Sequence, residues 1–375
     1  MLLTETQEAV REAIRRFAQE KIAPHAAAFE AAGVYPTEIF TALADLGMMG
    51  MTAPEQFGGA NADFVSYALA LMEIAAADAA LAAILSVHNC PVISAILQNG
   101  TSLQKERFLP ALTRGRIIGA FALTEADAGS DASAIRMRAR TIDGGYVLDG
   151  SKQFVTSGRI AGLAIMFAVT DSSAGKRGIS AFLVPTERAG YKVDRVEHKM
   201  GQQASDTCAI SCSDLFVEGE LRLGSEGEGY RIALSNLEGG RIGIAAQSVG
   251  IAQAALSLAV AYAKQRRSMG KIIIEHQAVG FRLAEMAAQL ESARQLTLHA
   301  AALKESGRPC LKEAAMAKLV ASETAERVCS GAIQTLGGYG YLEDFGLAKL
   351  YRDVRACQIY EGTSDIQRML ISRSL

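Results

Sequence analysis

The segment FALTEADAGSD at residues 121–131 marks the point where the pattern of the sequence changes. Before it, residues 1–120 have a helix-forming composition in which prolines separate Ala-rich stretches such as residues 66–85. After it, as far as about residue 218, short apolar runs alternate with turn residues, which is typical of antiparallel strands. The helical pattern returns at about residue 226 and continues to the end of the chain.

Individual runs support this division of the chain. Strands are predicted at four apolar runs, Tyr146–Leu148, Ala164–Val169, Ile179–Val184 and Phe216–Val217. A long helix is predicted where apolar residues recur at helical spacing: Phe281, Leu283, Met286, Leu290, Ala293, Leu296, Ala300 and Leu303. The order of helices, strands and helices argues against an alternating βαβ sheet. We therefore predict a mostly α fold of the α+β class, with a helical domain at residues 1–120, an antiparallel β domain at 121–225 and a helical domain at 226–375.

The composition argues against several classes of protein. The 375 residues suffice for roughly two to three domains, and half of them are apolar, so a large core is possible. A net charge of −2 argues against a nucleic-acid partner. No run of about 18 or more apolar residues occurs, so we predict no transmembrane helix. The N-terminus has the pattern of an amphipathic helix rather than a secretory signal, with an apolar face formed by Val10, Ile14, Phe17, Ala18 and Ile22.

The six cysteines form no recognisable metal or disulfide pattern. They stand at positions 90, 208, 212, 310, 329 and 357, without a CxxC pair and without a histidine cluster nearby. We therefore expect no metal site, and buried free thiols in a reducing cytoplasm. The sequence also lacks G-x-G-x-x-G and G-x-S-x-G, so neither a Rossmann dinucleotide site nor a nucleophile elbow has support.

The segment YEGTSDIQR at residues 360–368 contains a candidate general base. Its Glu361 stands among an aromatic ring, a glycine and two hydroxyls, and Cys357 and Ile359 make the approach partly apolar. Loss of hydration raises a carboxyl pKa toward the working pH, which suits a general base. The alternative is a helix that begins here with Thr363 or Ser364 as its cap, where Glu361 only favours the helix dipole.

Two segments at the start of the predicted β domain carry groups suited to a planar or phosphorylated ligand. In residues 121–131, Thr124 and Ser130 offer hydroxyls, and Gly129 lets a ligand approach the backbone, whose N–H groups can bind phosphate. Residues 154–158 (FVTSG) place an aromatic face beside a hydroxyl. The alternatives are an ordinary polar turn for the first segment and a strand that ends in a turn for the second.

Two further segments lie in the last third of the chain. Residues 266–271 (RRSMGK), with Gln277 shortly after them, form a cationic cluster at a predicted helix end that could meet phosphate. The alternative is a solvated helix terminus. Residues 334–340 (QTLGGYG) contain three glycines, which would end a helix and bring the backbone close to a ligand. A plain loop after a helix would have the same composition.

Taken together and in this order, the five segments resemble the acyl-CoA dehydrogenase family over essentially the whole chain. The sequence is most similar to the short-chain, butyryl-type members across residues 239–247 and 312–318. The resemblance implies an N-terminal helical domain, a middle β domain and a C-terminal four-helix bundle. It also implies non-covalent FAD and a homotetramer in which a neighbouring subunit completes each site.

The resemblance assigns roles to individual residues of this sequence. Within the chain, the implied FAD contacts are Phe121, Leu123, Thr124, Gly129, Ser130, Phe154, Val155, Thr156, Thr363, Ser364 and Asp365. Those implied for the FAD of a neighbouring subunit are Arg266, Ser268, Met269, Gln277, Gln334, Thr335, Leu336, Gly337 and Gly338. The implied substrate contacts are Ser130, Glu238, Arg241, Tyr360, Gly362 and Arg373. Three positions depart from the usual family pattern: Phe154 stands where many members have tryptophan, Met269 where phenylalanine is frequent, and Asp365 where glutamate or glutamine is typical.

The resemblance identifies Glu361 with the catalytic base of most members. A minority, including the isovaleryl type, carry the base at the position held here by Gly240, which cannot act as one. Glu361 would take the α-proton of an acyl-CoA thioester while the β-hydrogen leaves as hydride to flavin N5, giving a trans-2-enoyl-CoA as in fatty acid β-oxidation. An electron-transfer flavoprotein would then accept the electrons. Since no targeting segment is visible, we expect a cytoplasmic enzyme of bacterial type.

Several alternatives remain open at this stage. The nearest is a dehydrogenase for short branched acyl-CoAs, such as isobutyryl- or 2-methylbutyryl-CoA. An acyl-CoA oxidase is disfavoured because the extra C-terminal domain common in oxidases is missing, and Glu361 argues against a nitroalkane oxidase or a desulfinase of this fold. A catalytically silent helical scaffold belongs to a different class. The colour of the purified protein distinguishes that class, because a flavoprotein is yellow.

Overall fold

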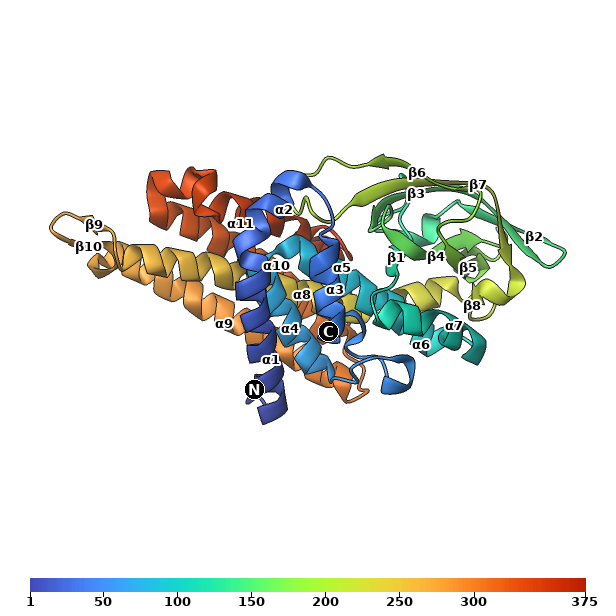
Figure 1. Cartoon of the computed structure of the whole chain (residues 1–375), viewed down its shortest axis with the longest axis horizontal. Helices are drawn as coiled ribbons and strands as arrows, with labels where there is room; N and C mark the ends of the chain where they lie inside the picture. The colour runs from blue at the N-terminus through green and yellow to red at the C-terminus, as the bar shows by residue number, and fades with distance from the viewer.

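The computed structural model describes all residues 1–375. The molecule is elongated, with helices in the centre and at one end and a sheet at the other (Figure 1). This arrangement confirms the predicted mostly α fold with a middle β domain.

The N-terminal region is helical; α1 to α5 lie at the centre of the molecule, and α6 and α7 lie beside the sheet (Figure 1). The first helix begins at the capping box of Thr4 and Gln7 and buries Ile14 on its apolar face; the predicted face continues into the following π-helical turn, which buries Ala18 and Ile22. The helices of this region are α1 (Glu5–Phe17), α2 (Ala26–Ala32), α3 (Thr37–Asp45), α4 (Phe64–Ala77), α5 (Ala79–Val87), α6 (Ser94–Asn99) and α7 (Ser102–Thr113).

The middle region is one sheet with strand order β6-β7-β3-β2-β4-β5-β8, and β1 pairs with β4. The four predicted apolar runs lie in β3, β4, β5 and β7. Most neighbours are antiparallel, as predicted, but β1 and β2 each pair with β4 in parallel. Because the apolar residues 118–120 are buried on β4, β1 begins before residue 121, where the sequence pattern changes. The strands are β1 (Ile118–Ala122), β2 (Arg138–Ile142), β3 (Gly145–Thr156), β4 (Ala161–Val169), β5 (Ile179–Pro185), β6 (Tyr191–Val196), β7 (Thr207–Glu218) and β8 (Arg222–Leu223).

The C-terminal region consists of three long helices and two short ones. The helix α10 packs against α8 and α9 along their length, and against α11 and α12. A small hairpin between α8 and α9 projects at the end of the molecule that is remote from the sheet (Figure 1). The elements are α8 (Gly229–Ala263), β9 (Arg267–Ser268), β10 (Lys271–Ile272), α9 (Gln277–Glu305), α10 (Leu311–Leu336), α11 (Leu347–Val354) and α12 (Ser364–Ser372).

The helix α8 connects the two cores of the molecule. Near its start, Ile232 and Ala233 are buried in the core of the sheet. Further along, Ile242 and the residues after it are buried in the helical core. Residues 238–241 therefore lie at the junction of the two cores, where helical and β parts of the chain can both reach a ligand.

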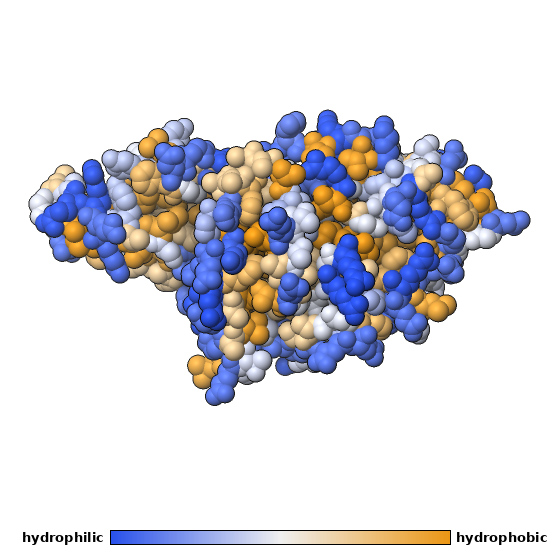
Figure 2. Space-filling view, viewed as in Figure 1, coloured by the Kyte–Doolittle hydropathy of each residue, from blue (hydrophilic) through white to orange (hydrophobic).

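Two helical stretches, Ala79–Asn99 and Gly229–Ala263, are long and apolar enough to cross a membrane by length and composition. The search for an uninterrupted apolar run in the sequence missed them, because polar residues interrupt both stretches. In the most apolar 18 residues of each stretch, 83% and 67% of the residues, respectively, are buried inside the structure, as expected for helices at the centre of a core. Figure 2 shows polar and charged residues spread over the whole length of one face, with no continuous apolar belt. All six cysteines are free and buried, as predicted.

Candidate active site

Glu361 presents a buried carboxylate without partners. It lies between a short 3₁₀ turn and α12, with a left-handed backbone (φ +52°). Both carboxylate oxygens are buried, and neither accepts a hydrogen bond. Burial raises the pKa of Glu361 to about 7, although the positive charges of Arg241 and Lys318 act in the opposite direction. A carboxyl group with this pKa exchanges protons readily near neutral pH, which is the property of a general base.

Two side chains hold the backbone around Glu361 by hydrogen bonds to its carbonyl groups. Lys318 Nζ, from the buried face of α10, donates a hydrogen bond to the carbonyl of Gly362 at 2.8 Å. Gln367 Nε2 donates to the same carbonyl at 2.8 Å and to the carbonyl of Glu361 at 3.3 Å. Thr363 caps α12 by accepting from Ile366 N at 3.4 Å. Thr363 is therefore the helix cap that one of the two interpretations of this segment predicted, and Glu361 lies two residues before it, outside the helix.

Gly240 on α8 forms the opposite wall of the Glu361 site. A Cβ atom built on Gly240 would lie 2.1 Å from Oε2 of Glu361, so the carboxylate rests directly against the helix backbone. The two positions that the resemblance offers for the base, 361 and 240, thus face each other in this structure. Only a residue without a side chain at position 240 leaves room for Glu361.

Arg241, for which a contact with CoA is predicted, lies buried near Glu361. The residue is 5% exposed, and its Nε and Nη1 atoms are buried without a partner. Burial lowers the pKa of this guanidinium, while Glu361 and Glu238 act to raise it. Glu238 is itself bound to Lys304 Nζ at 3.0 Å. The charges nearest the candidate base are therefore Arg241 and Lys318; Arg373 lies exposed at the end of α12.

Two of the predicted flavin segments are brought together at the edge of the sheet. Thr124 O accepts a hydrogen bond from Gln153 N at 2.8 Å, which joins the loop after β1 to the end of β3. Lys152, which is fully buried, binds Leu123 O at 3.1 Å and Glu125 Oε1 at 2.8 Å. Next to it, Phe154 has a left-handed backbone (φ +58°) and is 63% exposed. An aromatic side chain held out in this way is available to a planar ligand.

Ser130 and Gly129 are exposed farther along the same loop. A Cβ atom built on Gly129 would meet nothing within 4 Å, so the backbone is open to a ligand there. Thr156 is half-buried at the end of β3, whereas Val155 is buried beneath it. Thr124 and Phe121 are also half-buried and Leu123 is buried. Sequence reasoning did not identify Lys152 and Glu125 as the pair that holds this loop.

A second group of predicted flavin residues gathers at a groove of about 390 Å³. The groove is lined by Arg266 after α8, by Gln334, Thr335 and Leu336 at the end of α10, and by Gly337 and Gly338 beyond it. The helix ends at Leu336, as the glycines predicted. Ser268 and Met269 lie in the nearby hairpin, where Met269 is 91% exposed, and Gln277 is exposed at the start of α9.

The two groups of flavin residues do not meet within one chain. The hairpin of β9 and β10 lies at one end of the long axis, whereas β1, β2 and β3 lie toward the other (Figure 1). Glu361 lies against Gly240 of α8, at the junction of the two cores. One chain therefore presents one set of contacts at each end.

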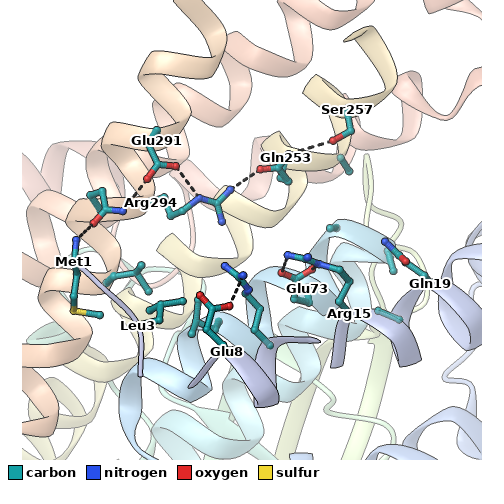
Figure 3. A pocket seen from close by; sticks show the side chains of 18 of the residues that line it. Met1, Leu3, Glu8, Arg15, Gln19, Glu73, Gln253, Ser257, Glu291 and Arg294 are labelled. Carbon is teal, nitrogen blue, oxygen red and sulfur yellow. Dashed lines mark hydrogen bonds and ion pairs between the residues drawn. The ribbon is translucent and has the colours of Figure 1, made fainter. Parts of the chain in front are cut away.

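The largest of the main grooves contains none of the predicted site residues. It has a volume of about 770 Å³ and lies between the N-terminal segment, α4, α8 and α9. Charged side chains in it are paired with one another (Figure 3): Arg15 binds Glu73 at 2.8 Å, and Arg294 binds Glu291 at 3.2 Å. Because these groups satisfy one another, the groove offers few free charges to a ligand.

Comparison with known proteins places the chain in a family. Residues 4–116, 120–215 and 227–375 match the families described as Acyl-CoA dehydrogenase, N-terminal domain, middle domain and C-terminal domain, respectively. The chain belongs to the acyl-CoA dehydrogenase family. It is 45% identical over 375 residues to an acyl-CoA dehydrogenase of Bacillus subtilis (strain 168), covering 100% of this chain and 99% of the relative.

Solved structures give the same result. The chain is similar to butyryl-CoA dehydrogenase from Megasphaera elsdenii, with a TM-score of 0.98, 42% identity and coverage of 100% of this chain and 99% of that one. It is also similar to a chain of the structure described for the electron transferring flavoprotein of Acidaminococcus fermentans, with a TM-score of 0.96, 39% identity and coverage of 100% and 98%.

Members of this family are FAD-dependent, and the residues of this chain fit the cofactor. The loop that contains Gly129 leaves its backbone open, Phe154 presents an exposed aromatic ring beside it, and the groove near Arg266 combines a cation with open glycines. These are the groups that phosphate and a planar ring require. The chain is thus an acyl-CoA dehydrogenase and a flavoprotein oxidoreductase.

Proposed function

We propose that this chain dehydrogenates short-chain acyl-CoA thioesters, with Glu361 as the base that removes the α-proton. The observation that carries the proposal is the buried carboxylate of Glu361, which has no hydrogen-bond partner and a pKa raised to about 7. A carboxylate with free lone pairs at the junction of the helical and β parts is ready to accept a proton from a substrate. The similarity to butyryl-CoA dehydrogenase supports a short acyl chain.

The backbone of Glu361 supplies a second part of the chemistry. A thioester α-proton is weakly acidic, so the negative charge that develops on the carbonyl oxygen must be stabilised. No backbone hydrogen bond within the chain uses the N–H of Glu361. This N–H belongs to the same residue as the proposed base, and it is free to donate a hydrogen bond to the substrate carbonyl. The left-handed backbone of Glu361 lets its N–H and its carboxylate act on the same substrate.

FAD would be held by the exposed loop and Phe154 at one end of a chain and by Arg266 and the 334–338 segment at the other. When bound, it supplies a hydride acceptor for the β-hydrogen of the substrate. Since the two sets of contacts lie at opposite ends of one chain (Figure 1), we propose that two copies complete each FAD site within a homotetramer. The implied contacts of Thr363, Ser364 and Asp365 belong to the same proposal.

An electron-transfer flavoprotein is the acceptor that we propose for the electrons. Its support is the similarity of this chain to a chain of the Acidaminococcus fermentans electron transferring flavoprotein structure. Reduction of such a partner by the substrate-reduced protein, followed by the absorbance of both flavins, measures this step directly. A reduced protein that reacts with oxygen but not with that partner would favour an oxidase instead.

A substrate panel tests the proposed reaction. The purified protein should be yellow, and anaerobic butyryl-CoA should bleach its flavin. Measurement of kcat/KM over straight and branched acyl-CoAs with an artificial electron acceptor should give the highest values for short straight chains. A preference for isobutyryl- or 2-methylbutyryl-CoA would replace the proposed substrate class with the branched one. A colourless protein that cannot be reconstituted with FAD would contradict the flavoenzyme assignment itself.

A further inference from the structure

We propose that Gln202, from the β domain, is a positioning residue that acts on Glu361 through Tyr360. The proposal rests on the role of Glu361 given above. It concerns a contact outside the motifs of the sequence: the loop between β6 and β7 crosses to the C-terminal helices and reaches the residue that immediately precedes the base.

The loop lies in direct contact with the backbone of α11. A Cβ atom built on Gly201 would lie 2.7 Å from the backbone of Arg352 and of Asp353. Gln202 is 5% exposed and has a left-handed backbone (φ +54°). Its N–H donates to Asp353 Oδ1 at 2.5 Å, and its side-chain Nε2 donates to the Asp353 carbonyl at 2.8 Å. Main chain and side chain of Gln202 are thus bound to the same residue.

The hydroxyl of Tyr360 lies between two glutamines, with Cys357 Sγ at 3.5 Å. Gln247 Nε2 on α8 donates to the carbonyl of Ala79 at 2.7 Å, so its Oε1 is turned toward the phenol. Tyr360 donates to that oxygen at 2.5 Å and accepts from Gln202 Nε2 at 3.4 Å. A phenol has one proton to donate and a lone pair to accept, so both capacities are used. The implied contact of Tyr360 with substrate therefore does not involve a free hydroxyl.

This arrangement determines where Glu361 lies along α8. Gln247 and Gly240 are seven residues apart and so share one face of the helix, about 10 Å from each other. Tyr360 is fixed at Gln247, and the next residue, Glu361, rests its carboxylate against Gly240. Because Glu361 has a left-handed backbone, which is strained for a residue other than glycine, its neighbours must hold it in place. Gln202 and Gln247 hold it through Tyr360 on one side, while Lys318 and Gln367 hold the following carbonyls on the other.

The residue that anchors Gln202 is itself fixed by charge. Asp353 binds Lys349 Nζ at 2.5 Å, and the same Nζ lies 3.1 Å from Asp78, which caps α5. Arg352 binds Glu30 of α2 at 2.7 Å. The ion pairs that fix Asp353 and Arg352, next to Gln202, therefore join charged residues of the N-terminal and C-terminal parts. The base is held by a network that draws on all three parts of the chain.

Substitution of Gln202 by asparagine tests the proposal. Asparagine tolerates the left-handed backbone and retains the N–H that binds Asp353, but its shorter amide reaches neither Tyr360 nor the Asp353 carbonyl, so the cycle with Tyr360→Phe below is needed to isolate the contact with the phenol. The matched control is Gln203→Asn, because the side chain of Gln203 binds only Lys199 O of the same loop, at 2.7 Å. Each holoenzyme is reduced anaerobically with saturating butyryl-CoA, and the rate constant of flavin bleaching is measured beside the FAD content and the Kd for crotonyl-CoA.

We expect Gln202→Asn to lower the rate constant of bleaching about tenfold, because a small displacement of a base has effects of this size. FAD content and the Kd for crotonyl-CoA should stay within about twofold of the wild-type values, as should every value for Gln203→Asn. A bleaching rate within twofold of wild type in Gln202→Asn would overturn the proposal, as would an equal loss in Gln203→Asn. No bleaching of the wild-type flavin by any acyl-CoA would instead overturn the proposed function.

A double-mutant cycle with Tyr360→Phe separates action through Tyr360 from a general effect of the loop. Tyr360→Phe removes the hydroxyl and keeps the ring, and it should lower the bleaching rate by a similar factor. The double variant should be no slower than the slower single variant. If the bleaching rate of the double variant falls by the product of the two single factors, the two residues act independently, which would contradict action through the phenol. If Gln202→Asn does not fold, an unchanged bleaching rate in Tyr360→Phe overturns the proposal by itself.

Discussion

Two glutamates in this molecule have side chains largely shielded from solvent, but they differ in their hydrogen bonds. Glu125 accepts hydrogen bonds from Lys152 Nζ at 2.8 Å, from Arg136 N at 2.6 Å and from Met137 N at 3.0 Å. Glu361 accepts none, although both of its oxygens are buried. A buried carboxylate with filled lone pairs is stable as a charge and supports the loop around it. One with empty lone pairs is costly as a charge and tends to take a proton.

The cations beside the two glutamates show the same difference. Lys152 binds Glu125 directly, and burial lowers its pKa to about 8 even so. Lys318 and Arg241 influence Glu361 without binding its carboxylate, and Lys318 gives its hydrogen bond to the backbone of Gly362 instead. The positive charge near Glu361 therefore limits the rise of its pKa without using its lone pairs. The comparison separates an acid that holds a loop from the acid that we propose as the base.

Exchange of each acid for its amide should produce the largest difference. Glu361→Gln should retain FAD and acyl-CoA binding but lower the rate of flavin reduction by butyryl-CoA about 10³-fold, because the base is lost. Glu125→Gln should retain most of the rate per bound FAD but lower the free energy of unfolding by about 3 kcal/mol, because Lys152 loses its buried partner. Stopped-flow bleaching and chemical denaturation measure the two effects. Rapid bleaching in Glu361→Gln would end the assignment of the base.

A methyl group on Gly240 should have the next largest effect. Its Cβ would lie 2.1 Å from Oε2 of Glu361, so the carboxylate must move. We expect Gly240→Ala to lower the rate of flavin reduction between about tenfold and a hundredfold, with little loss of FAD. Gly219→Ala is a suitable control, because a Cβ there would meet no atom closer than 3.6 Å. Equal rates in the two variants would show that the carboxylate does not depend on the wall formed by α8.

The pH dependence of flavin reduction should be about tenfold between pH 6 and pH 8. The base must be ionised to accept a proton, and the pKa of Glu361 is about 7, so kcat/KM should rise through this range. The effect on stability has the opposite sign. Since the folded state raises this pKa from 4.5, the protonated side chain stabilises the fold below pH 4.5, and that contribution is lost as the pH rises through 7.

The loss of stability on ionisation of Glu361 amounts to about 3 kcal/mol. The free energy of unfolding of the wild type should therefore fall by this amount between pH 4.5 and pH 8, when it is compared at each pH with that of Glu361→Gln. Denaturation of the two proteins in parallel at several pH values measures the difference. A constant difference would mean that the buried carboxyl does not titrate in this range.

Removal of one nearby cation should have the smallest effect. The charge of Lys318 lowers the pKa of Glu361, so Lys318→Met should raise that pKa and move the pH profile upward by up to about one unit. Gln367 still holds the carbonyl of Gly362 in this variant. Lys312→Met, on the same helix but away from Glu361, should leave the profile unchanged. A profile that moves downward would contradict the proposed influence of Lys318.

Much of the fold followed from local patterns. The strand runs in β3, β4, β5 and β7 and the end of α10 at Leu336 were predicted, because alternation, turn residues and glycines are local signals. The parallel pairing of β1 with β4 was not, because a buried apolar run does not state its partner. The residues of the five motifs were also found in the sequence, although the roles given to most of them came from a family resemblance and stay predictions.

The contacts that distinguish the two glutamates could not be read from the sequence. Lys152 and Glu125 are 27 positions apart and Lys318 and Gly362 are 44 apart, so only folding brings them together. Gln202 carries no motif, and its contact with Tyr360 spans 158 positions. The burial of Arg241 near Glu361 could not be read from the sequence either, and its contact with CoA stays a prediction. Such contacts depend on the packing of α8, α10 and α11, which no local pattern encodes.

The sequence by itself determined that this chain is an acyl-CoA dehydrogenase with helices on either side of a β region, and it named Glu361 as the candidate base. Composition, periodicity and a resemblance over the whole chain suffice for that, because each is a property of residues in order. Only the tertiary structure decided that the carboxylate of Glu361 is buried, has no partner and rests on Gly240. The physical reason is that hydration, and with it the pKa of an acid, depends on which distant residues fold around it.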